Sequence, residues 1–143
     1  MDIRPISPRY AVSAQISVDD VPAIAKAGIV TVICNRPDSE VPVQQQAAAI
    51  RAAVEAAGLR FEVLELTMQT MTPQNIASQH AMVAESAGPV LAYCRSGTRC
   101  SIVWALAQAG NMETDEILST TASAGYPLAD LRPTLDRLSQ TGD

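Results

Sequence analysis

A cysteine with two arginines close behind it is the pattern in this sequence that most clearly points to chemistry. Cys94 stands in the run Y-C-R-S-G-T-R-C, residues 93–100; a short apolar stretch precedes that run and a longer one follows it. This change of pattern predicts that Cys94 lies at a turn between a buried strand and a helix. Backbone N–H groups and a helix N-terminus at such a turn attract anions and stabilise a thiolate. We therefore interpret Cys94 as a catalytic nucleophile.

The five residues after Cys94 are predicted to complete an anion-binding loop. Gly97 permits a tight curl, because a side chain there would obstruct both the turn and the ligand. The guanidinium of Arg99 can hold two oxygens of an anion at once, so we expect it to be the second catalytic residue. The residues predicted to bind the substrate are Arg95, Ser96, Gly97 and Thr98. A lone cysteine after a strand is more often an inert core residue, but arginines on both sides of the loop favour the reactive thiol.

The spacing within this loop bears on the kind of reaction. Four residues separate Cys94 from Arg99, and this Cys-x4-Arg form resembles the active loop of rhodanese-type sulfurtransferases. Tyrosine and dual-specificity phosphatases have one residue more before their arginine, and Cys100 takes that position here. The resemblance implies a loop suited to sulfur transfer. Cys100 is predicted either to be a buried helical thiol or to form a reversible disulfide with Cys94 under oxidation.

Length and composition indicate one domain covering residues 1–143. Nearly half of the residues, 48%, are apolar, which is enough for a hydrophobic core. The net charge of −5 and the single lysine argue against nucleic acid or an anionic membrane as a partner. No apolar run could span a bilayer and no signal peptide is evident, so we expect a cytoplasmic protein. The three cysteines form no spaced framework, and the sequence suggests neither a metal site nor a cofactor.

Predicted strands and helices alternate along the chain. Such alternation is typical of an α/β protein, here with a mainly parallel sheet of four or five strands and helices on both faces. The strand at Tyr10–Ile16 alternates apolar and polar residues and is expected at an edge, whereas the apolar run Ile29–Cys34 suits an inner strand. A third strand is predicted before Cys94, at Arg60–Leu66. The predicted helices are 17–28, 43–57, 72–86, 101–109 and two short ones between 112 and 138.

A second polar loop, Asn35–Glu40, follows the strand at Ile29–Cys34. The carboxyl ends of parallel strands meet at one edge of a sheet, where ligands usually bind. Arg36 and Asp38 are therefore predicted to bind the substrate beside Cys94. The alternative is a simple turn, in which Asp38 accepts from nearby amides and Arg36 pairs with a neighbouring acid.

Three segments together resemble a known bacterial family. They are Ala14–Ser17, Asn35–Glu40 and Tyr93–Arg99, in this order and spacing. The family was first described as phosphatases, and both phosphatase and sulfurtransferase activities have been attached to it. It also forms the front domain of beta-lactamase-hydrolase-like sulfur dioxygenase fusions. The resemblance covers nearly the whole chain. It implies the fold of dual-specificity phosphatases, Cys94 as the nucleophile, and a sulfur dioxygenase as a partner.

Two reactions of Cys94 are compatible with these features. As a sulfurtransferase, the protein would take sulfane sulfur from thiosulfate or a persulfide and carry it as a Cys94 persulfide. As a phosphatase, it would form a phosphocysteine from a phosphate ester, and an acid would have to protonate the leaving group. The loop Thr67–Met71, where the phosphatase-like fold usually carries that acid, has no carboxylate; Asp38 or Asp130 would have to replace it. The sequence thus favours sulfur transfer, with phosphatase as the alternative and a non-catalytic anion sensor as a third possibility.

Overall fold

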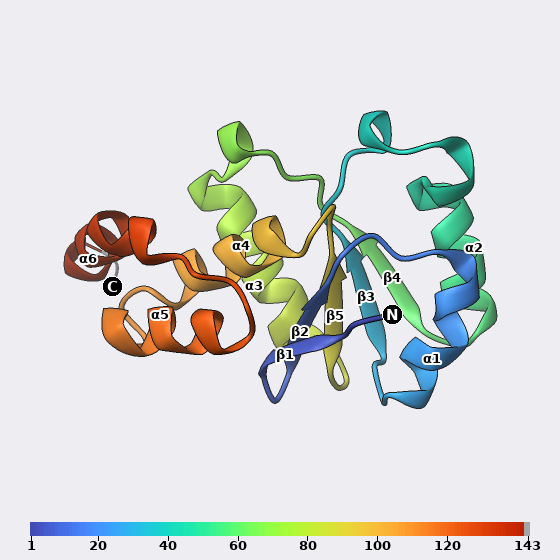
Figure 1. Ribbon diagram of the computed structural model, residues 1–143, viewed down its shortest axis with the longest axis horizontal. Coiled ribbons are helices and arrows are strands. Elements are labelled where there is room, and N and C mark those ends of the chain that lie inside the picture. The colour runs from blue at the N-terminus through green and yellow to red at the C-terminus, as the bar shows by residue number, and fades with distance from the viewer. Residues whose placement is uncertain (142–143) are drawn as a thin grey trace.

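A computed structural model of the chain describes residues 1–141 and contains one five-stranded sheet (Figure 1). The strand order is β1-β2-β5-β3-β4; β1 is antiparallel to β2, and the remaining neighbours are parallel. The predicted α/β architecture with a mainly parallel sheet is therefore confirmed. The strands are β1 Arg4–Ser7, β2 Tyr10–Ser13, β3 Thr31–Cys34, β4 Arg60–Val63 and β5 Val90–Tyr93.

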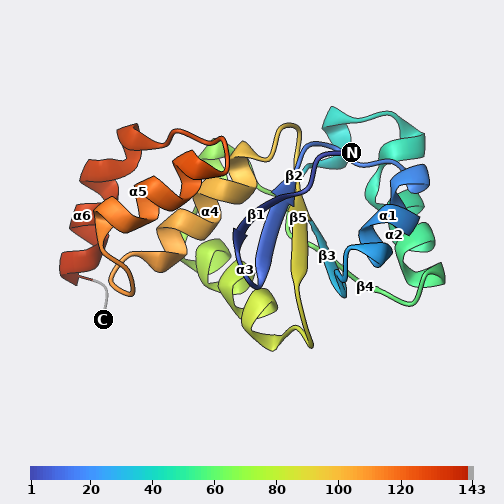
Figure 2. The same ribbon diagram turned by 60° about the horizontal axis from the view of Figure 1, so that its bottom comes forward.

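Helices cover both faces of the sheet, as predicted (Figures 1 and 2). Helices α1 and α2 lie on one face, α3 and α4 lie on the other, and α5 and α6 pack beyond α4. The helices are α1 Val21–Lys26, α2 Ala47–Ala56, α3 Pro73–Glu85, α4 Thr98–Gln108, α5 Thr114–Ser123 and α6 Arg132–Thr141. No helix within residues 1–141 is long and apolar enough to cross a membrane.

The alternation of side chains along each strand produces two hydrophobic cores. In β5, Leu91 packs in the core under α1 and α2, whereas Ala92 packs in the core under α4. In β3, Val32 packs in the core under α1 and α2, and Ile33 packs in the core under α4. All four side chains are fully buried. Successive residues of a strand point to opposite faces, so a strand with no polar position needs cover on both sides.

The arrangement and the bounds of several elements differ from the sequence-based predictions. The strand that begins at Tyr10 is not at the edge, because β1 pairs with its outer side and forms the edge instead. Strand β1 escaped prediction since it includes Pro5, which lacks a backbone N–H. Strand β4 ends at Val63 rather than at Leu66. The chain then continues to a short 3-10 helix at Met68–Thr70. Helix α4 begins three residues earlier than predicted, because Gly97 takes the N-cap position.

The parallel strands end together, and this alignment brings the two polar loops to one edge of the sheet. The last residue of β5, Tyr93, is in register with the last residues of its two neighbours, Ser13 in β2 and Cys34 in β3. The segments that follow β2, β3 and β5 consequently lie next to one another (Figure 1). The backbone joins them as well: Cys94 N donates to Ser13 O and Asn35 N donates to Tyr93 O.

Candidate active site

Cys94 lies at the turn between β5 and α4, as the sequence predicted. The residue is 1% exposed, and its sulfur accepts a hydrogen bond from the backbone N–H of Gly97 at 3.1 Å. Gly97 is the N-cap of α4 and has a φ of +92°, in the left-handed region that favours glycine. The sulfur is thus held near the positive end of a helix of eleven residues. This is an environment that stabilises a thiolate.

Hydrogen bonds to the sulfur outweigh the effect of burial on Cys94. The Cys100 thiol donates to it, and the backbone N–H groups of Cys100, Ser96 and Gly97 add to that effect. Together these donors lower the pKa of Cys94 to about 5 although its burial opposes the charge. Burial instead raises the pKa of the Cys34 thiol and, well above its ordinary value, that of Cys100. Cys94 is therefore the cysteine in this chain whose thiolate forms below neutral pH.

Tyr126 supports the loop from behind, which the sequence analysis did not predict. Its hydroxyl donates to the Ser96 carbonyl at 3.0 Å. The same hydroxyl lies where a side chain on Gly97 would have to stand. Tyr126 follows α5 and is 30 residues from Ser96 in the chain, so no local pattern could have linked the two. The loop is therefore fixed on its outer side by the C-terminal part of the protein.

Arg99 is held in place by Glu40, a residue that the sequence analysis had assigned only to the turn around Arg36. The two terminal nitrogens of the guanidinium donate to the two carboxylate oxygens of Glu40: Arg99 Nη1 to Oε2 at 3.0 Å and Nη2 to Oε1 at 2.8 Å. Nη1 also donates to the Leu66 carbonyl at 2.9 Å. A guanidinium has five N–H groups, so Nε–H and one N–H of Nη2 remain. No acceptor among residues 1–141 takes them, and they form one edge that matches two oxygens of an anion.

Arg36 lies in the same cluster, whereas Asp38 is turned away from it. Arg36 Nε donates to Glu40 Oε1 at 3.2 Å, so Glu40 contacts both arginines. Asp38 Oδ1 accepts from the backbone N–H of Ala47 at 2.8 Å, at the start of α2. Asp38 thus accepts from a nearby amide, as the turn alternative predicted. Arg36 pairs with its neighbouring acid, Glu40, and lies beside Arg99.

Glu40, the carboxylate that contacts Arg99, is not available to protonate a leaving group at Cys94. Hydrogen bonds from Arg99, followed by those from Arg36, lower the pKa of Glu40, so this carboxylate stays ionised. After β4, Glu65 is exposed; the loop Thr67–Met71 that follows it contains no acid, and Thr67 and Thr70 bond to each other. Asp130 is exposed in a short 3-10 helix, Ala129–Leu131, before α6.

The remaining predicted substrate-binding residues line the open side of the loop. The side chains of Arg95, Ser96 and Thr98 are exposed, and the two hydroxyls are 2.9 Å apart. Their role toward a substrate stays a prediction. Within residues 1–141, no group of three or more His, Cys, Asp or Glu side chains is placed to hold a metal ion.

The family of the chain follows from its sequence match. Residues 2–111 match the family described as the phosphatase-like domain of beta-lactamase hydrolase-like proteins. The chain belongs to this family. The beta-lactamase hydrolase-like protein of Xylella fastidiosa strain 9a5c is 32% identical over 139 residues, which are 96% of this chain and 32% of that protein. The chain therefore spans about a third of the length of this relative.

Solved structures with the same fold are phosphatase-like. A crystal structure from Neisseria meningitidis, named as a candidate phosphatase, has a TM-score of 0.87 and 35% identity, covering 96% of this chain and 98% of that one. The structure of P. aeruginosa TpbA in complex with pTyr has a TM-score of 0.65 and 17% identity, covering 98% and 91% of the two chains. At that identity the second likeness concerns the fold alone. The predicted phosphatase-like fold is thus confirmed for this family member.

Proposed function

We propose that this family member is a cysteine-dependent phosphatase that hydrolyses small phosphate monoesters through a Cys94 phosphocysteine. The observation that carries the proposal is the pairing of a Cys94 thiolate, with its pKa of about 5, and an Arg99 guanidinium whose Nε edge is open. A nucleophile and a bidentate anion site on one loop are what phosphoryl transfer requires. The phosphatase-like family and fold support the same reaction class.

The reaction would take place in two displacements. First, the Cys94 thiolate attacks phosphorus, the P–O bond breaks, and the alkoxide or phenoxide leaves with the bonding electron pair. Water then attacks the phosphorus, the P–S bond breaks, and inorganic phosphate leaves as the thiolate re-forms. Arg99 and the N–H groups of the loop would balance the charge on the non-bridging oxygens.

The ionised state of Glu40 limits the substrates. A leaving group that must be protonated, such as the alkoxide of phosphoserine, would depart slowly, because Glu40 is ionised and tied to two arginines. A phenoxide leaving group is stable enough to depart unaided. We therefore propose aryl phosphates as the preferred esters.

Turnover of para-nitrophenyl phosphate by the wild-type protein and by Cys94→Ser tests this proposal. We expect hydrolysis by the wild type, no hydrolysis by the variant, and a gain of one phosphoryl group on Cys94 in the intact mass after acid quenching. Hydrolysis that survives in Cys94→Ser, or a phosphoryl group on another residue, would contradict it.

Sulfane sulfur transfer is a second candidate, and the short Cys-x4-Arg loop favours it. The Cys94 thiolate would attack the outer sulfur of thiosulfate, the S–S bond would break, and sulfite would leave. A thiolate or cyanide would then attack the terminal sulfur of the Cys94 persulfide and release the cysteine thiolate. This route needs no acid, and a sulfur dioxygenase partner stays a prediction attached to it.

The two candidates are separated by assaying one preparation with both kinds of substrate. A gain of one sulfur atom on Cys94 after thiosulfate treatment, with cyanide-dependent turnover, identifies the sulfurtransferase. A phosphoryl gain without any sulfur gain identifies the phosphatase. If kcat/KM for thiosulfate exceeds that for aryl phosphate, sulfur transfer becomes the main function.

A further inference from the structure

We infer that Tyr10, Gln79 and Asn35 form a buried positioning network for the nucleophile loop. The three residues come from β2, from α3 and from the first position after β3. They are 1%, 2% and 0% exposed, so solvent does not reach their polar groups. The inference rests on the proposed roles of Cys94 and Arg99, and it assigns a function to polar side chains that do not touch the substrate site.

A reciprocal amide pair forms the centre of this network. Gln79 Nε2 donates to Asn35 Oδ1 at 2.9 Å, and Asn35 Nδ2 donates back to Gln79 Oε1 at 3.0 Å. Each amide also uses its second N–H: Gln79 Nε2 donates to the Tyr10 hydroxyl at 3.2 Å, and Asn35 Nδ2 donates to the Leu64 carbonyl at 2.7 Å. All four side-chain N–H groups are therefore satisfied.

Both ends of the network reach backbone groups that fix Arg99. At one end, the Tyr10 hydroxyl donates at 2.8 Å to the carbonyl of Cys100, which follows Arg99 in the first turn of α4. At the other end, the Asn35 carbonyl accepts from the N–H of Leu66 at 2.8 Å. The carbonyl of Leu66 in turn accepts from Arg99 Nη1. The network thus connects the helix turn that carries Arg99 with the strand exit to which its side chain bonds.

Packing alone does not explain these polar residues. Helix α3 covers the sheet with an apolar face, and a leucine in place of Gln79 would fill the same interior without an amide. A buried polar group destabilises the fold unless its hydrogen bonds are made, whereas a fully satisfied network defines one arrangement of the elements it joins. The arrangement defined here is that of β2, β3, the β4 exit and α4 around the loop.

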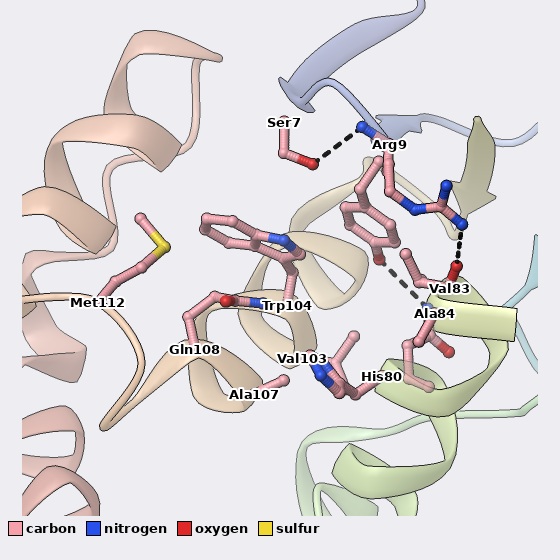
Figure 3. Close-up of a pocket in the computed structure, with 12 residues that line it drawn as sticks. Ser7, Arg9, His80, Val83, Ala84, Val103, Trp104, Ala107, Gln108 and Met112 are labelled. Atoms are coloured by element: carbon pink, nitrogen blue, oxygen red, sulfur yellow. Dashed lines mark hydrogen bonds between the residues drawn. The ribbon is translucent and has the colours of Figure 1, made fainter. Parts of the chain in front are cut away.

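The network borders a cavity that supplies a useful reporter. Tyr10 and Gln79 are among the residues that line a cavity of about 350 Å³ beside α3 and α4 (Figure 3). Tyr10 lies at the opposite end of β2 from Ser13, which is in register with the residue before Cys94. Trp104, the one tryptophan of the chain, lines it too and faces it together with His80 and Met112. The emission of Trp104 therefore reports whether the packing around the network is kept in a variant.

Tyr10→Phe is the first test, because it removes the donor to Cys100 O and leaves the ring in place. We expect the dissociation constant for inorganic phosphate to rise roughly fivefold, which is the size of one hydrogen bond. We also expect the midpoint of Cys94 alkylation by iodoacetamide to move to higher pH. Gln79→Leu should act in the same direction and more strongly, since it removes both hydrogen bonds between Gln79 and Asn35. Trp104 emission and cooperative unfolding should show that Tyr10→Phe still folds.

Tyr93→Phe is the matched control. It removes a buried hydroxyl from β5, next to Cys94, that makes no hydrogen bond to the network and has the Cys34 thiol beside it. It should leave phosphate affinity unchanged. In an Arg99→Ala background, Tyr10→Phe should no longer affect phosphate affinity, because the residue acts through Arg99.

The inference is overturned if Tyr10→Phe lowers stability but leaves both phosphate affinity and the Cys94 alkylation midpoint at wild-type values. It is also overturned if its effect is undiminished in the Arg99→Ala background. Neither measurement needs turnover, so a protein that proves inactive toward aryl phosphates would refute the proposed phosphatase activity without deciding this question.

Discussion

At the scale of single residues, Cys94 differs from the other two cysteines by the donors around its sulfur. Its pKa is about 5, while burial raises the pKa of Cys34 and of Cys100. At pH 6 and without denaturant, we expect iodoacetamide to alkylate Cys94 alone. Peptide mapping over a series from pH 4 to 9 should give a midpoint near 5 for Cys94. Equal labelling of Cys34 at pH 6 would contradict the loop geometry.

Glu40 directs which edge of Arg99 is open. Glu40→Gln removes the charge that holds the guanidinium, so we expect phosphate affinity and kcat/KM for aryl phosphate to fall about tenfold. Asp38→Asn on the same loop is the matched control, since its carboxylate caps α2 instead. The control should lower the free energy of unfolding but leave phosphate affinity intact. Isothermal titration with phosphate measures the first effect and urea unfolding the second.

The identity of the nucleophile and its arginine could be predicted, because those residues are close together in the chain. The partners that orient them could not. Glu40 is 59 residues from Arg99 and Tyr126 is 30 from Ser96, so only the folded chain shows these contacts. The sequence favoured sulfur transfer because the length of the Cys94 loop is a local feature. The family and the fold, which involve the whole chain, favour the phosphatase instead.

At the scale of elements, the turn between β5 and α4 depends on Gly97. Gly97→Ala places a side chain at a φ of +92° and against the Tyr126 hydroxyl, so we expect about 1–3 kcal/mol of lost stability and a raised pKa for Cys94. Thermal unfolding and the alkylation profile measure the two effects. Combining it with Tyr126→Phe, which removes the obstructing oxygen, should restore part of the stability. No recovery would mean that backbone strain and the remaining Tyr126 ring, whose Cζ would be 2.9 Å from the added Cβ, account for the loss.

Most helices and inner strands were predictable because their periodicity and end residues are local. The helix opened by Thr72 is an example: Thr72 accepts from Asn75 N, as its position before Pro73 suggested. Strand β1 was not predictable, since Pro5 argues against a strand there and the strand exists through its pairing with β2. The early start of α4 was missed because a glycine usually signals the end of a helix.

At the scale of the whole molecule, the Cys94 thiolate links stability to pH. Its pKa is lowered in the folded state, so between about pH 5 and 9 the unfolded chain binds a proton that the folded chain does not. The free energy of unfolding should therefore rise with pH in that window, by up to ~1.4 kcal/mol per pH unit from this group, and the gain is lost as the pH falls toward 5. Urea unfolding of wild type and Cys94→Ser under reducing conditions should differ by this slope. Parallel curves for the two proteins would exclude a buried thiolate.

The two outer strands of the sheet also bear on how the protein behaves when concentrated. Free strand edges can pair with those of another molecule and start aggregation. Here one edge strand, β1, carries Pro5 and the ion pair between Arg4 and Asp2 beside it, while the other, β4, carries an ion pair between Arg60 and Glu62. Charges and proline at an edge oppose such pairing. We expect replacement of Arg60 and Glu62 by valine to promote the formation of intermolecular sheets when the protein is concentrated.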